Sequence, residues 1–200
     1  MFEECQKLTS LDITSFDMSN VIKASNLFQH CSSLKSLDLS KFNTENMKDI
    51  SHMFQGCSLL TSLDLSLFKT KNVEDFSYLF DQIRNLTSLD LSTLDTSNGK
   101  NMYHMFSSCE NLRTLKNMNF NTQNVEDMAN MFERCSSLTN LDLSSFDTSK
   151  VEDMYFGSCS SLNNLEISNF KTQLVEDMSH MLDGCKNVLN LNIKGLIFLK

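Results

Sequence analysis

The 200-residue sequence has no proline, no tryptophan, only five glycines and no long apolar run. Its longest uncharged apolar stretch, residues 195–199, is far shorter than the roughly 20 residues that cross a bilayer. The N-terminus lacks a basic region followed by an apolar stretch, which a signal peptide would have. The glycines are scattered and form no phosphate-binding loop. We therefore expect no membrane segment and no signal peptide in this chain.

Basic residues are also few. The chain has 17 Lys and Arg against 25 Asp and Glu, a formal net charge of −8, and no basic cluster. Nucleic acids and anionic membranes are bound through a basic patch, so neither is expected as a partner. With 40% hydrophobic residues, a chain of this length can bury a continuous core, which argues against disorder.

Cysteine recurs along the chain at a fixed interval. Six of the seven steps between neighbouring cysteine slots are 26 residues, and the step from Cys135 to Cys159 is two residues shorter. One slot holds Ile83 instead. The seven cysteines are Cys5, Cys31, Cys57, Cys109, Cys135, Cys159 and Cys185. Such a period is typical of a repeat protein, in which each unit covers the apolar face of its neighbour.

Apolar residues repeat in step with the cysteines. Residues 37–39 alternate apolar and polar side chains, which predicts a short strand with Leu37 and Leu39 facing inward. Strands of successive units should then stack in parallel, about 4.8 Å apart. Residues 131–135, in the pattern Met-Phe-x-x-Cys, have the spacing of a helical turn. Residues 125–130 fit either a helical turn or a second short strand.

One unit has a recognisable sequence. Residues 135–154 read Cys-Ser-Ser-Leu-Thr-Asn-Leu-Asp-Leu-Ser-Ser-Phe-Asp-Thr-Ser-Lys-Val-Glu-Asp-Met. This closely resembles the repeat of BspA-like leucine-rich-repeat surface proteins, which occur in bacteria and some protists. Eight successive units share the resemblance, and together they cover almost the whole chain. The sequence departs from the family's repeat at four places. These are Ile83 in the cysteine slot, Lys116 and Asn117 where the family has Asp-Leu, Gly99 in a valine slot, and the two-residue deletion before Cys159.

The resemblance implies an α/β fold, a right-handed leucine-rich-repeat solenoid with short parallel strands and short helical turns. About seven to eight units would form a single domain over residues 1–200. The family is often displayed at the cell surface and binds host or matrix proteins and other cells. Its repeat carries no catalytic residues.

The cysteine slot belongs to an otherwise apolar ladder, which favours buried free thiols. Neighbouring units about 5 Å apart would also bring cysteine Cα atoms within disulfide range, so pairing between adjacent units stays open. Zinc needs converging ligands, usually from close cysteine pairs, and no cysteine here has another within twenty residues. We expect neither a metal site nor another cofactor.

The histidines offer no catalytic arrangement. His52, His104 and His180 share one position of the unit, and His30 stands elsewhere. Two units separate His52 from His104, about 10 Å at strand spacing, which is too far for a shared metal or a proton relay. We expect the histidines at solvent-facing positions on helical turns. Their spacing forms no Ser-His-Asp or Cys-His catalytic arrangement. We predict that the protein is not an enzyme.

The candidate binding site is a column of charged residues between the strand leucines. Its members that we assign to partner binding are Asp12, Asp38, Asp64, Asp90, Lys116 and Asp142. The next two units carry Glu166 and Asn192 in this slot, and the flanking slots are mostly serines. Such a column would attract a basic protein or a cation. The alternative interpretation is that these aspartates keep a long sheet soluble and orient its turns.

Two function classes remain open from the sequence. The first is an adhesion or protein-binding array, at the cell surface or secreted. The second is an intracellular scaffold in the cytoplasm, which free buried thiols also fit. The chain begins and stops in mid-repeat, so we expect a fragment of a longer protein or ends that pack end to end. The exposed ends would offer the apolar residues Leu8, Leu11, Phe16, Leu191, Ile193, Leu196, Ile197 and Phe198.

Overall fold

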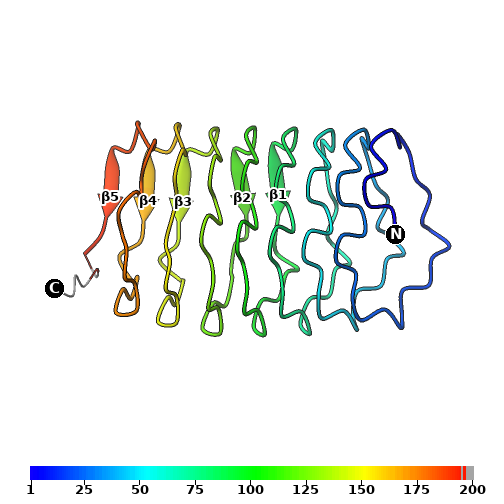
Figure 1. Ribbon diagram of the computed structural model, residues 1–200, viewed down its shortest axis with the longest axis horizontal. Helices are drawn as coiled ribbons and strands as arrows, with labels where there is room; N and C mark the ends of the chain where they lie inside the picture. Colours follow the sequence, from blue (N-terminus) through cyan, green and yellow to red (C-terminus); the bar gives the residue numbers. More distant parts are fainter. Residues whose placement is uncertain (195, 197–200) are drawn as a thin grey trace.

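The computed structural model of the chain describes residues 1–194 and 196. Similar coils lie side by side along one long axis, with the first unit and β5 at opposite ends (Figure 1). Backbone hydrogen bonds join each coil to the next, as from Ala24 N–H to the Asp49 carbonyl at 2.9 Å. Each unit is thus packed against the unit that follows it in the sequence, as the 26-residue period predicts.

The described residues form five short strands, all paired in parallel. Strands β1 (Ser88–Asp90) and β2 (Thr114–Lys116) form one pair, and β3 (Asn140–Asp142), β4 (Asn164–Glu166) and β5 (Asn190–Asn192) form a three-stranded sheet. In both sheets the central leucines lie opposite one another, as Leu89 does Leu115. Residues 37–39 lie outside these strands but keep the predicted alternation, with Leu37 and Leu39 buried and Asp38 exposed. The prediction of short parallel strands in a repeat pattern is confirmed.

The helical turns that we predicted around Met-Phe-x-x-Cys are wrong, because residues 1–194 and 196 contain no helix. Consecutive turns take their place. In residues 50–57, alternate N–H groups donate to carbonyls of the next unit at 2.8–3.3 Å; these donors are Ile50, His52, Phe54 and Gly56. The N–H groups of Met53, Gln55 and Cys57 donate three residues back.

Left-handed residues explain why this segment cannot be helical. His52 has φ 56° and Gly56 has φ 70°, and equivalent positions in most other units are also left-handed. An α-helix needs right-handed φ throughout and keeps its N–H bonds within one segment. Here the alternation points every second N–H along the long axis, so it links neighbouring units.

A column of phenylalanines fills the centre of the stack. Phe28, Phe54, Phe80, Phe106 and Phe132 are fully buried, and the ring centroids of consecutive members lie 5.4–6.1 Å apart. Such aromatic pairs contribute about 0.5–1.5 kcal/mol each beyond their buried area. Because every ring contacts the units on both sides, the core is shared between units.

The cysteine column confirms the prediction of free thiols. Cys31, Cys57, Cys109, Cys135 and Cys159 are buried, and all seven cysteines are free. Buried thiols donate to a phenylalanine carbonyl of the preceding unit, as Cys57 does to Phe28 at 3.1 Å. Cys5 is exposed and Cys185 partly buried, so the buried-thiol prediction fails at Cys5. No unit among the described residues lies on the N-terminal side of Cys5 to cover it.

The two-residue deletion before Cys159 is absorbed locally. Phe156 takes the core position, 6.4 Å from Phe132, and Cys159 remains fully buried. Tyr155 folds across Gly157, where an added Cβ would lie 2.0 Å from the tyrosine hydroxyl oxygen. A side chain at position 157 would therefore force the Tyr155 ring to move.

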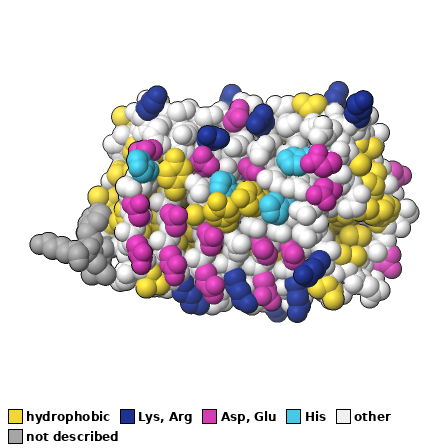
Figure 2. All heavy atoms as spheres, viewed as in Figure 1, with side chains coloured by type: hydrophobic (Ala, Val, Ile, Leu, Met, Phe, Trp, Pro, Cys, Tyr) yellow, Lys and Arg dark blue, Asp and Glu magenta, His cyan; other side chains and the backbone are white. Residues whose placement is uncertain are grey.

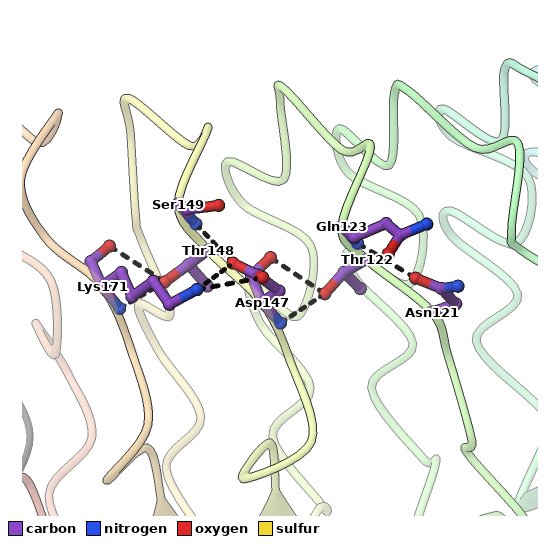
Figure 3. A network of polar contacts seen from close by, with 7 residues as sticks. All are labelled: Asn121, Thr122, Gln123, Asp147, Thr148, Ser149 and Lys171. Atoms are coloured by element: carbon purple, nitrogen blue, oxygen red, sulfur yellow. Dashed lines mark hydrogen bonds and ion pairs between the residues drawn. The ribbon is translucent and has the colours of Figure 1, made fainter.

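Buried threonines form a second link between units (Figure 3). The Thr122 hydroxyl donates to the Asp147 carbonyl at 3.0 Å and accepts from the Asp147 N–H at 2.7 Å. Thr148 makes the same pair of bonds with Lys171, at 2.9 and 2.7 Å. One hydroxyl thus satisfies both backbone groups of a residue in the next unit.

Replacing this hydroxyl by a methyl group tests its contribution. Thr122→Val keeps the shape but leaves the Asp147 N–H and carbonyl without this partner, so we expect the free energy of unfolding to fall by about 1–3 kcal/mol. Thr122→Ser retains the hydroxyl and serves as the control, with a smaller loss. Denaturant melts of both variants give the difference, and equal losses would show that the hydroxyl contributes nothing.

Candidate functional site

The structure places the predicted site residues in one exposed column. Asp12, Asp38, Asp64, Asp90, Lys116 and Asp142 are all exposed. In each aspartate, Oδ1 accepts the N–H of the residue two positions later, at 2.9–3.0 Å. These bonds open the turn that follows the strand position, as in an Asx-turn. Hydrogen bonds from side chains and from these backbone N–H groups together lower the pKa of all five aspartates, so these carboxylates are ionised at neutral pH.

Lys116 relieves charge repulsion in the middle of the column. Its strand position pairs in register with Asp90. Asn117 donates its side-chain amide to Asp90 Oδ1 at 3.0 Å, and this bond is the main cause of the lowered pKa of Asp90. In the N-terminal half, by contrast, the carboxylate of Asp38 works against the ionisation of Asp64. The run from Asp12 to Asp64 therefore places three carboxylates in successive units with no lysine in the column between them.

An asparagine column lies beside the carboxylates in the C-terminal half. It was not predicted from the sequence. Asn164 donates to Asn140 Oδ1, and Asn190 donates to Asn164 Oδ1. These residues line an open groove of about 480 Å³ over β3, β4 and β5, together with Asp142 and Glu166. The signal in the sequence is a change of one slot from Ser36, Ser62 and Ser88 to asparagine in the last three units.

The groove offers hydrogen-bonding groups next to apolar area. Asn192 donates to Glu166 Oε2 at 2.8 Å, which fixes the carboxylate at the groove floor. Leu189 lines the groove and is 81% exposed. A partner could therefore bury a leucine and bond to side-chain amides at the same place.

A second acidic column follows the turn segments. Parallel bridges join Lys23, Asp49, Asp75, Asn101 and Asp127 in successive units. The aspartates cap turns here too, as Asp49 Oδ1 does by accepting the Ser51 N–H at 3.0 Å. Lys100 pairs with Glu74 at 2.7 Å, which balances charge between neighbouring units.

The apolar residues expected at the ends are unequally covered. Leu8, Leu11 and Phe16 are partly buried, whereas Leu191 and Ile193 are exposed. Leu196 is partly buried, and Ile197 and Phe198 lie outside the described residues. End-to-end packing through these residues stays a prediction.

Within the part of the chain that the structure describes, no helix has the length and apolarity needed to cross a membrane.

The chain is similar to one described protein family and to solved structures. A family described as "Mycoplasma protein of unknown function, DUF285" matches residues 1–118 and 113–196. No curated protein sequence matches significantly. Among solved structures, a leucine-rich repeat protein from Bacteroides ovatus ATCC 8483 is similar with a TM-score of 0.53 at 19% identity, over 86% of this chain and 42% of that chain. A leucine-rich repeat protein from Eubacterium ventriosum ATCC 27560 is similar with a TM-score of 0.45 at 13% identity, over 90% of this chain and 59% of that chain.

The likeness to the Bacteroides ovatus protein shows the leucine-rich-repeat fold. At this identity it shows the fold alone. The chain spans less than two thirds of the length of both solved proteins.

Proposed function

Because the chain belongs to the family described as Mycoplasma protein of unknown function, DUF285, and has a leucine-rich-repeat fold, we propose that it is a non-catalytic protein-binding module. One observation carries the proposal: five ionised aspartates stand exposed in one column of a long, repeated face. Each is held at a defined position by a backbone N–H. A fixed row of like charges is complementary to a basic partner surface.

The partner that fits this face is a basic protein. The column has few large apolar side chains, so each unit contributes little and binding strength accumulates along the array. The groove over β3 to β5, with Asn164 and Leu189, supplies the hydrogen bonds and the apolar contact that the N-terminal half lacks. Lys116 marks the boundary between the two halves.

The resemblance of the repeat to BspA-like surface proteins supports a more specific form of this proposal. The chain would be one domain of a right-handed solenoid, displayed at a cell surface and binding a host or matrix protein in adhesion. The second candidate is an intracellular scaffold that joins proteins, and the free buried thiols favour it because they suit a reducing compartment. Protease treatment of intact and lysed cells separates the two, since only a displayed protein is cleaved on intact cells.

Replacing three aspartates of the column together tests the binding face. In the triple variant Asp38→Asn, Asp64→Asn and Asp90→Asn, each amide oxygen still accepts the turn N–H, so the fold should be retained. We expect weaker capture of a basic partner and a smaller dependence of affinity on salt, because exposed charges act through a field screened over about 8 Å. Titration calorimetry at two salt concentrations measures both.

A matched variant removes the same charge elsewhere. Glu3→Gln, Glu110→Gln and Glu152→Gln alter three exposed carboxylates outside the column. This variant should bind almost as the natural chain does. If both triple variants lose affinity equally, net charge and not the column determines binding.

A further inference from the structure

Stacked rings occupy one position of the turn segments in three consecutive units, and the last unit carries a single histidine, His180, at the same position. His52, Tyr78 and His104 occupy the same position in three consecutive units, five residues before the cysteine slot. All three are left-handed, with φ of 56°, 55° and 53°. In the flanking units Asn26 and Asn130 hold this position, and asparagine tolerates left-handed φ better than a bulky residue does. The backbone alone therefore favours asparagine, and the rings need another explanation.

The rings stack on one another along the surface. The His52 and Tyr78 centroids lie 4.4 Å apart, and those of Tyr78 and His104 lie 4.9 Å apart, with planes 17° and 11° from parallel. Tyr103 stands edge-on, 4.2 Å from His104 and 5.3 Å from Tyr78. All four side chains are partly exposed. Figure 2 shows histidines beside hydrophobic side chains near the middle of one face, with acidic side chains in rows next to them.

A buried carboxylate fixes His52 through a glutamine side chain. Asp81 is 3% exposed and accepts from Gln55 Nε2 at 2.7 Å and from Gln82 Nε2 at 3.1 Å. Because the Gln55 amide nitrogen faces Asp81, its oxygen faces His52, 2.7 Å from Nδ1. His52 Nδ1 is therefore the donor. His52 is thus held in one orientation before any partner arrives, which lowers the entropy lost on binding.

The electrostatic environment of the ring column is negative. Burial raises the pKa of Tyr78 to about 12, and the carboxylates of Asp81 and Asp127 add to this. The charged groups that act on His104 are also carboxylates, those of Asp81, Asp127 and Glu133. His104 Nδ1 lies 3.8 Å from Glu133 Oε2. A partner group at this surface therefore meets aromatic rings and acidic side chains together.

We propose that the ring column, His52, Tyr78, Tyr103 and His104, binds arginine side chains of a basic segment in a partner protein. A guanidinium group is planar, stacks against aromatic rings and pairs with carboxylates through two N–H bonds. Asp127 supplies the carboxylate, since Glu133 Oε1 already lies 3.5 Å from Arg134 Nε. Lysine matches the charge but neither the planar stacking nor the fork, so arginine is the better fit. This surface belongs to the turn segments, so it is a second site, independent of the strand-face column.

The test uses a fluorescein-labelled peptide that alternates arginine and glycine. Two peptides of the same length carry lysine or the neutral isostere citrulline instead. Fluorescence polarisation with the full chain, at about 150 mM ionic strength, should rank affinity as arginine above lysine above citrulline. Tyr78→Asn restores the residue of the flanking units, so the backbone is kept, and arginine-peptide affinity should fall about tenfold. In Asp127→Asn, the affinity for the arginine peptide should fall by a similar factor.

Two further variants decide the outcome. Tyr103→Ser installs the residue that Ser51 and Ser77 provide at the same position, and it replaces Tyr78→Asn as the test if the latter lowers the melting temperature strongly. In the Asp38, Asp64 and Asp90 triple variant, the preference for the arginine peptide over the lysine peptide should persist, which separates this proposal from the strand-face proposal. Equal affinity for the arginine and lysine peptides, or unchanged affinity in Tyr78→Asn and Tyr103→Ser, would overturn it.

Discussion

Leu89→Asp should lower the free energy of unfolding by more than about 4 kcal/mol and leave most of the array unfolded. Leu89 is 2% exposed at the centre of β1, opposite Leu115 of β2. A carboxylate at this place would be buried without a partner. Since each unit covers the apolar face of the next, the damage should extend to both neighbouring units. Circular dichroism during urea denaturation measures the loss.

The neighbouring residue is the control. Ser88 lies in the same strand but is exposed, so Ser88→Ala should change the free energy of unfolding by no more than about 0.5 kcal/mol. Comparable losses in the two variants would mean that the inward and outward faces of β1 have been assigned wrongly.

Alkaline pH should destabilise the protein steeply because of the cysteine column. Burial raises the pKa of Cys57 and Cys135 to about 12, and that of Cys109 is raised by the same cause. An unfolded thiol has a pKa of about 8.5. Above that pH the unfolded chain releases these protons while the folded chain keeps them, so unfolding becomes more favourable as pH rises. The three thiols together should cost about 4 kcal/mol per pH unit between pH 9 and the folded pKa values.

A single substitution separates this effect from other titrations. Cys57→Ala removes one of the three protons, so the slope of unfolding free energy against pH should become shallower by about 1.4 kcal/mol per unit. Guanidinium melts at several pH values from about 8 to 11 give the slope. An unchanged slope in Cys57→Ala would show that the thiols do not cause the alkaline loss. In the native protein at neutral pH, a thiol reagent should modify Cys5 readily and the five buried cysteines only after denaturation.

The periodic core followed from the sequence because a repeat makes one pattern appear eight times. The alternation at residues 37–39 predicts which side chains point inward, and the structure buries Leu37 and Leu39 and exposes Asp38. The cysteine slot could likewise be assigned to the apolar interior, except at Cys5. The candidate aspartates could be placed in one exposed column. That they orient the turns was one of two interpretations that the sequence left open.

The helix prediction failed at Met-Phe-x-x-Cys for a physical reason. An apolar spacing of three is shared by a helical turn and by a series of tight turns, so periodicity cannot distinguish them. The hydrogen bonds from alternate N–H groups to the next unit decide the matter, and they form only when a second unit is present. His52 and Gly56 adopt left-handed φ to direct those bonds.

By itself, the sequence determined the period, the side chains that form the core and the column of aspartates, because these depend on spacing within one unit. Only the tertiary structure decided which side chains of different units touch. The distance from His52 to His104 suggested that they are unrelated, but Tyr78 of the intervening unit joins their rings into one stack. The asparagine ladder from Asn140 to Asn190 forms in the same way. Such contacts depend on the residue that the neighbouring unit places alongside, which no single unit of the sequence contains.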